Sequence, residues 1–179
     1  MARAYNEAGQ ELTVVYEFGT LEVSLDVTVT AYEKTFTYDG TEKNCDPDDF
    51  WTQGLPEGFS VSVTFGEGLV VTGSKDVEIV DVRVYDQNGN DVTEMCNLKV
   101  KTAKLTVLPR TLTVYVYGQS ADSIAPVQGT LVEGHTMFAE YGEEGECYIE
   151  ITDARGELVY SNRDDSPVKY TLYDVIIQR

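Results

Sequence analysis

The sequence predicts an all-β fold of tandem small β-sheet modules, sandwich-like or β-grasp-like, with at most one short helix. Three observations predict this fold class: alternation of apolar and polar residues, turn motifs between the alternating segments, and an internal repeat. Apolar residues at every second position are typical of strands with one buried face. They recur from end to end of the chain, at Leu21, Val23, Leu25, Val27, Val29, Val61, Val63, Val80, Val82, Val84, Leu105, Val107, Leu112, Val114, Ile149 and Ile151.

Turn motifs separate the alternating segments. Glycine tolerates positive φ, and Asn or Asp side chains bond to the following backbone, so these residues favour hairpin and loop tips. The best helical candidate is residues 46–51, where Asp46 could cap a turn with Pro47 at its first position. A loop accounts for that segment equally well. The turn motifs lie at residues 38–41, 66–68, 88–90 and 154–156.

The two halves of the chain resemble one another, which indicates a repeated structural unit. Three pairs of residues lie 76 positions apart, namely Gly54 with Thr130, Gly58 with Gly134, and Phe65 with Tyr141. Further on, Asp86 matches Asp153 at the shorter separation of 67 positions. The second copy therefore lacks nine residues, near positions 69–77 of the first, and the loss shortens a loop or an edge strand.

Similar alternating segments close each copy, at residues 20–25, 104–109 and 174–177. They predict three units: a C-terminal remnant of a preceding repeat at 1–25, a first module at 26–109 and a second, divergent module at 110–179. Hardly any linker separates the two modules. A module of this size buries a modest core, so a shared interface with its neighbour would stabilise it.

The first module carries a series of short motifs in a fixed order: VTVTA at 27–31, TYDGT at 37–41, GLPEG at 54–58, VYD at 84–86, GNDVT at 89–93 and LTV at 105–107. This order resembles the MBG-type and YDG-type repeat modules of bacterial cell-surface adhesin-like proteins. The resemblance implies all-β modules in an adhesin or stalk, and no catalysis. The second module departs from the pattern, because Tyr117-Gly118-Gln119 stands where Tyr-Asp-Gly is expected.

Composition limits the partners that we expect. Thirteen Lys and Arg residues against 31 Asp and Glu residues give a net charge of −18. Such a surface repels nucleic acid and anionic lipid headgroups. No apolar run reaches the length of about 18–20 residues that spans a bilayer, so we expect no membrane insertion.

We therefore expect a structural or adhesive repeat region of a secreted or cell-surface bacterial protein, acting as a stalk or spacer that contributes to binding. The alternative is a module of a larger extracellular protein that binds glycan or a host protein. The expected partners are neighbouring repeat modules of the same chain and host glycan or protein. We expect the chain outside the cell, at the surface or cell wall, with its targeting and anchor segments outside these residues.

A calcium ion is the one cofactor that any spacing indicates. Alternate oxygen-bearing side chains on a tight loop can converge on one ion, and the candidates are Asp86, Asn88, Asn90 and Asp91. The loop departs from a calcium-binding pattern, because its glycine stands at the fourth position and Asn97 stands where a bidentate Glu is expected. Asn88-Gly89 is a hairpin dipeptide, so a plain turn is the favoured interpretation.

Two aromatic residues, Phe50 and Trp51, are candidates for stacking against sugar rings, although a lone Trp is more often a core residue. His135 is the only histidine and occupies the place of Phe59, so we expect it to pack against the sheet with a polar edge outward. Without a second histidine no hydrolase triad can be assembled, and we predict no catalytic residues and no enzyme.

The three cysteines form no metal-binding cluster. Cys45 and Cys96 lie in one module, where a disulfide is conceivable but not fixed by sequence, and we expect Cys147 to be a buried thiol. Intramolecular Lys to Asn or Asp crosslinks are likewise left open. Lys34, Lys75 and Lys99 are available for them.

Overall fold

The computed structural model describes residues 4–5, 11–12, 24–118, 120, 124–142, 145–168 and 171–179. Strands dominate these residues, and the only helix among them is a single 3₁₀ turn, η1 (Thr93–Met95). The all-β prediction is therefore confirmed. The segment 46–51 is a turn that leads into a strand, not a helix. Most of the predicted remnant at 1–25 lies outside the described residues; within it a short antiparallel pair is described, β1 (Ala4–Tyr5) and β2 (Glu11–Leu12).

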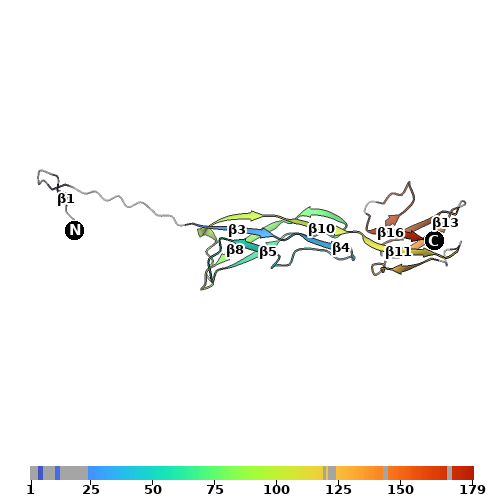
Figure 1. Ribbon diagram of the computed structural model, residues 1–179, viewed down its shortest axis with the longest axis horizontal. Helices are drawn as coiled ribbons and strands as arrows, with labels where there is room; N and C mark the ends of the chain where they lie inside the picture. Colours follow the sequence, from blue (N-terminus) through green and yellow to red (C-terminus); the bar gives the residue numbers. More distant parts are fainter. Residues whose placement is uncertain are drawn as a thin grey trace.

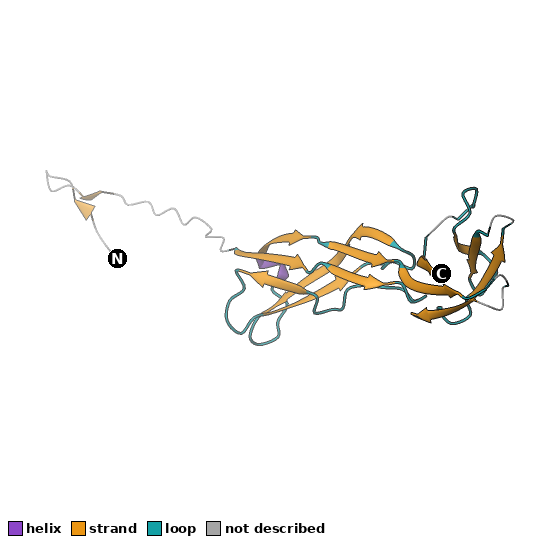
Figure 2. Cartoon of the chain, turned by 45° about the vertical axis from the view of Figure 1, so that its right-hand side comes forward, coloured by secondary structure: helices purple, strands orange, loops and turns teal. Residues whose placement is uncertain are grey.

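Two groups of strands follow one another along the chain and along the long axis of the molecule (Figures 1 and 2). The first unit contains β3 (Leu25–Ala31), β4 (Lys34–Thr37), β5 (Phe50–Gln53), β6 (Ser60–Phe65), β7 (Gly73–Asp76), β8 (Ile79–Tyr85), η1, β9 (Cys96–Lys101) and β10 (Lys104–Leu108). The second contains β11 (Arg110–Val116), β12 (Ile124–Gln128), β13 (Thr136–Tyr141), β14 (Cys147–Thr152), β15 (Leu158–Ser161) and β16 (Tyr173–Gln178).

The first unit packs the sheet β5-β3-β9 against the hairpin β6-β8. Alternation places Val27 and Val29 of β3 on the inner face, where they meet Val63 and Val82 of the hairpin. A third sheet, β4-β10-β7, extends the unit toward its C-terminal end. There a separate cluster of Ala31, Cys45, Val77 and Leu105 forms the core.

The second unit repeats this arrangement. β3 lies between an antiparallel β5 and a parallel β9, and β11 lies between an antiparallel β12 and a parallel β16. The hairpin β13-β14 takes the place of β6-β8 and gains a third strand, β15. Its core contains Leu112 and Val114 of β11 with Ile149 and Ile151 of β14.

Two aspartates close equivalent turns after β8 and β14. The Asp86 carboxylate accepts hydrogen bonds from the backbone N–H of Asn88 and Asn90, at 2.8 and 2.9 Å. The Asp153 carboxylate accepts the same pair from Arg155 and Glu157, also at 2.8 and 2.9 Å. This agrees with the match of Asp86 to Asp153 in the sequence.

The nine-residue difference between the copies corresponds to an edge strand and a bulge. In the first unit the backbone N–H of Gly66 bonds to Glu78, and the intervening loop contains β7, which pairs with β10. In the second unit Gly142 bonds in the same way to Glu146, only four positions further on. The ladder β6-β8 also contains a register shift at Phe65, which accounts for the remaining residue.

One position in the sequence comparison was wrong by a residue. At constant spacing Gly54 matches Thr130, but the structure places Gly129 in the equivalent position. A Cβ on Gly54 would lie 2.1 Å from the carbonyl oxygen of Asp26, and a Cβ on Gly129 would lie 2.5 Å from that of Thr111, at φ values of +84° and +81°. Each carbonyl belongs to the second residue of its unit's first strand.

The match of residues 174–177 to residues 104–109 was also wrong. Asp174 pairs with Thr111 as Asn97 pairs with Asp26, so β16 is the counterpart of β9 rather than of β10. The error arose because both closing strands alternate, while the earlier strand that each pairs with is seen only in the structure. Alternation alone does not identify the partner of a strand.

We predict that Gly54→Ala destabilises the first unit more than Gly89→Ala does. Both glycines have positive φ, which costs an L residue about 1–2 kcal/mol, but a Cβ on Gly89 meets nothing within 4 Å. Gly54→Ala adds a clash with the Asp26 backbone. Urea denaturation of the two variants measures the difference, and an equal loss of unfolding free energy at both positions would contradict it.

Candidate functional site: the junction between the units

A turn at the end of β4 forms the most distinctive local structure of the first unit. The Tyr38 backbone N–H donates to the carbonyl of Leu108 at 2.9 Å, which holds the turn beside the end of β10. The Asp39 carboxylate accepts hydrogen bonds from the Thr41 N–H and the Lys43 ammonium. Lys43 and Thr41 together lower the pKa of Asp39 to about 2. We call residues 38–41 the tip.

The Tyr38 ring is buried although it belongs to a turn, with 6% of its surface exposed. It belongs to the same apolar cluster as the core of the second unit, together with Val107 of β10. Its ring centroid lies 6.2 Å from that of His135 and 6.2 Å from that of Tyr173. The tip of one unit thus completes the core of the next.

Hydrogen bonds fix the rings that receive Tyr38. The Val132 backbone N–H donates to the Tyr173 hydroxyl at 3.0 Å. That hydroxyl lies 2.9 Å from Nδ1 of His135, and the tautomer of the imidazole decides which of the two groups donates. Burial lowers the pKa of His135, which favours the neutral ring, while the charge of Asp153 opposes this to a lesser degree.

Backbone groups at the junction also have partners. The Arg110 guanidinium donates to the carbonyl of Tyr38 at 3.4 Å, to the carbonyl of Thr130, and to the Thr130 hydroxyl at 2.7 Å. On another side the Thr72 hydroxyl donates to the carbonyl of Thr171 at 2.9 Å. The bonds from Arg110 to Tyr38 and from Thr72 to Thr171 join the two units, and those to Thr130 hold the Arg110 side chain in place within the second unit.

Gly40 permits the close approach of the tip. A Cβ at this position would lie 2.6 Å from a methyl group of Val132, and its φ is +84°. A larger residue would push the tip away from the second unit. Linker length adds a further constraint, because Pro109 alone separates β10 from β11.

The oxygens of the calcium candidates are engaged in hydrogen bonds, among three of the candidates themselves and from Asp91 to its neighbours. Both oxygens of Asp86 accept hydrogen bonds, one from backbone N–H groups and one from the Asn90 side chain at 2.9 Å. The Asp91 carboxylate accepts a hydrogen bond from the Thr93 N–H, and the Arg83 guanidinium lies 3.2 Å from it. Among the described residues, no group of three or more His, Cys, Asp or Glu side chains is arranged to hold a metal ion.

Phe50 and Trp51 point to opposite faces of β5, as successive residues of a strand do. Phe50 packs against the core of the first unit. Trp51 is 42% exposed on the outer face, so the interpretation of this residue as part of the core was wrong. Of the two candidates, Trp51 alone presents a ring to solvent for stacking.

The structure describes the state of the three cysteines and the partner of Lys34. All three cysteines are free; Cys45 and Cys96 pack in different clusters, and Cys147 is a buried thiol as expected. Lys34 lies 2.6 Å from the Asp49 carboxylate. The pKa of Lys34 is raised by this carboxylate and that of Asp49 is lowered, which favours an ion pair over the neutral groups that amide formation requires.

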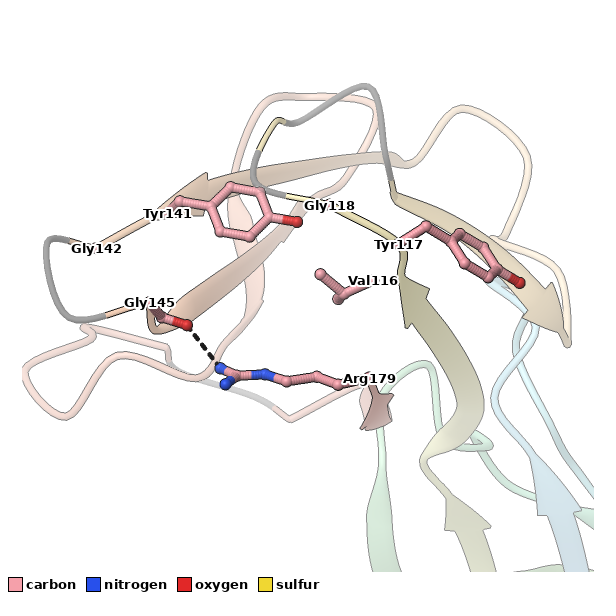
Figure 3. A pocket seen from close by; sticks show the side chains of 7 residues that line it. All are labelled: Val116, Tyr117, Gly118, Tyr141, Gly142, Gly145 and Arg179. Atoms are coloured by element: carbon pink, nitrogen blue, oxygen red, sulfur yellow. Dashed lines mark hydrogen bonds between the residues drawn. The ribbon is translucent and has the colours of Figure 1, made fainter.

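A cavity of about 590 Å³ opens at the far end of the second unit, between Tyr117, Tyr141 and Arg179 (Figure 3). The Arg179 guanidinium donates to the carbonyl of Gly145 at 2.8 Å. In the first unit the equivalent of Tyr141 is Phe65, which packs with Val77 and Leu105 in a core cluster. The cavity therefore belongs to the packing pattern of the fold, and we assign no ligand to it.

A scan against protein-family models, a search of curated proteins and a search of solved structures each returned no match. No helix in the described part of the chain has the length and apolar character needed to cross a membrane. Function is therefore inferred from the junction itself.

Sequence reasoning identified the tip as a turn and His135 as a packing residue, but it missed how they meet. It did not single out Arg110, Val132 or Tyr173 at all. One signal was present: an aromatic residue directly before an Asp-Gly turn would be exposed in an isolated hairpin. Such a residue indicates a partner surface.

We predict that the junction makes stability depend on pH through His135. Because the pKa of His135 in the folded chain lies below its ordinary value of 6.5, the folded chain binds this proton less readily than the unfolded chain. The contribution of the neutral His135 ring to the free energy of unfolding is therefore complete above pH 6.5, and it is lost as the pH falls through the lower pKa of the folded chain.

His135→Phe, which introduces the residue found at the equivalent Phe59, should remove this component. Urea midpoints measured between about pH 7.5 and pH 5.5 test it, since carboxylates contribute equally to both proteins in this range. An identical pH dependence in the parent and the variant would count against the junction role of the imidazole.

Proposed function

We propose that this chain is a structural and adhesive repeat region of a secreted or cell-surface bacterial protein, where it serves as a stalk or spacer that contributes to binding. Its two units are copies of one repeat module, residues 26–109 and the divergent residues 110–179. The observation that carries the proposal is the burial of Tyr38 in the core of the following unit, across a linker of one residue.

The shared core opposes bending at the junction. A hinge at Pro109 would expose Tyr38 and Val107, which are 6% and 2% exposed. Burial of such side chains stabilises a contact by about 1.5–3 kcal/mol each. A bent arrangement would also break the hydrogen bonds of Arg110 and Thr72. Such a joint favours a stiff connection over a flexible one.

Strand order gives each unit a suitable path for mechanical load. The first strand of the first unit, β3, pairs in parallel with β9 through six residue pairs, and β4 pairs in parallel with β10 through four. Tension applied at Leu25 and at Leu108 therefore pulls these strands past one another. Their hydrogen bonds must yield together rather than one at a time, which is what a load-bearing spacer needs.

Charge supports a location in aqueous surroundings, away from nucleic acid. The net charge of −18 keeps neighbouring chains apart and repels phosphate backbones. A spacer that projects a binding tip from a surface benefits from both properties.

A second function, glycan or host-protein binding by the chain itself, is favoured by one observation. Trp51 lies in register with Thr30 of β3, and Thr30 with Lys101 of β9, so the three side chains form a row on the outer face of one sheet. The flat Trp51 ring and the nearby Lys101 ammonium can stack on a sugar and bond to its hydroxyls, while the Thr30 hydroxyl between them is buried.

We predict that the chain scatters as a rod. A compact globule of 179 residues would have a radius of gyration of about 16 Å, and end-to-end units should give a clearly larger value that does not change with salt. Tyr38→Ser should preserve both units while broadening the distribution of distances. A compact profile for the parent chain would overturn the spacer proposal.

We predict that Trp51→Ala abolishes any glycan binding while leaving the rod intact. The matched control is Phe138→Ala, which removes another exposed aromatic ring, 56% exposed, from the second unit. A glycan array with both variants separates the two functions. Binding that survives Trp51→Ala would exclude this row of residues as the binding surface.

A further inference from the structure

Another cavity, with an apolar lining and a volume of about 410 Å³, opens at the N-terminal end of the first unit. We call it the socket. It lies between the start of β3, the loop before β6 and the turn η1, and its lining residues are Ser24, Leu25, Pro56, Phe59, Asp86, Val92, Met95 and Cys96.

The socket corresponds position by position to the surface of the second unit that receives the tip. Strand register pairs Leu25 with Cys96 and Arg110 with Tyr173, so these two pairs are equivalent. The matching turns equate Asp86 with Asp153. The hydrogen bond from the N–H of Met95 to Val92 recurs from Leu172 to Val159. Pro56 of the GLPEG motif and Phe59 directly after it correspond to Val132 and His135.

What differs is exposure. Leu172 is 5% exposed and Tyr173 is fully buried in the second unit, where the tip covers the surface. Their counterparts in the first unit are open: Met95 is 61% exposed, and Cys96 is only partly buried. Among the described residues, the same surface is thus covered by a tip in the second unit and by none in the first.

The socket differs from the tip-receiving surface of the second unit at three positions that contact one another there. In the second unit the Tyr173 hydroxyl accepts the Val132 N–H and bonds to His135. The first unit has Cys96, Pro56 and Phe59 at these positions, so the hydroxyl, the N–H donor and the imidazole are all replaced together. The thiol is also smaller than the phenol, which leaves room for a ring. The socket therefore offers apolar contact without unpaired polar groups.

We propose that the socket binds the aromatic tip of a further unit of this type placed ahead of Leu25, with a ring in the position of Tyr38. This inference rests on the proposed spacer function and names the partner of its open end. The Tyr38 of the same chain cannot be the occupant, because it is already buried in the second unit. Continuity with the observed junction identifies the occupant as a tip rather than a small ligand.

The test is an extended chain in which residues 1–108 are followed directly by residues 24–179. It places one tip ahead of a complete socket and leaves a second socket open. Methyl NMR of methionine reports on both sockets, because a Met95 lines each of them. Met137 lies in the second unit and serves as an internal reference. The reproduced signal of Met137 confirms that the added copy leaves the second unit folded.

The expected result is two Met95 signals: one at the position found in the 179-residue chain and one shifted upfield by the ring of the docked tyrosine. Tyr38→Ala in the first copy alone should return the shifted signal to the open position. Tyr38→Phe in that copy should keep the shift, because the socket offers apolar contact and needs no hydrogen bond from the tyrosine hydroxyl.

Two outcomes would overturn the inference. Coincident Met95 signals would mean that the socket stays empty beside a tip. A concentration-dependent shift in the 179-residue chain, abolished by Phe59→Asp, would assign the surface to contacts between separate chains. Neither outcome depends on the scattering of the 179-residue chain, so failure of the socket and failure of the spacer proposal are distinguishable.

Discussion

The structure depends on the burial of one aromatic ring at the tip of a turn. A turn of the first unit cannot bury Tyr38 within that unit, so the ring is buried only while the second unit stays in contact. The other features of the junction serve this contact. Gly40 removes the side chain that would strike Val132, Arg110 satisfies the carbonyl of Tyr38, and Asp39 holds the backbone of the tip in shape.

The two units show how one fold can vary the chemistry of its end surface while preserving its geometry. Glycines with positive φ and aspartates that cap turns occupy equivalent positions in both, because backbone shape requires them. The residues that receive a tip differ. Yet they differ as a set, since a hydroxyl that lost both the Val132 N–H and the His135 ring would remain as a buried polar group without a partner.

Alternation and turn motifs in the sequence were enough to predict the strands and the β class, and the internal repeat was enough to predict the nine-residue difference between the copies. They were not enough to align β16 with β9, because parallel pairing joins residues about 70 positions apart in the first unit and leaves no local signal. The junction was hidden for a similar reason. Tyr38 and His135 lie in different units, and each is an ordinary residue until the two are brought together. Whether Trp51 is exposed depends on which face of β5 points to the core, and the sequence does not reveal this.

The two ends of a unit are different surfaces, one with a protruding tip and one with a recess. Contacts of this head-to-tail kind leave one free surface at each end, and between separate chains stacked in line they produce open filaments. Two features direct the contact into the chain instead. A linker of one residue holds tip and recess together at high effective concentration, and a net charge of −18 opposes the approach of another chain. Together, the short linker and the acidic surface allow units to stack in line within one chain without aggregation between chains.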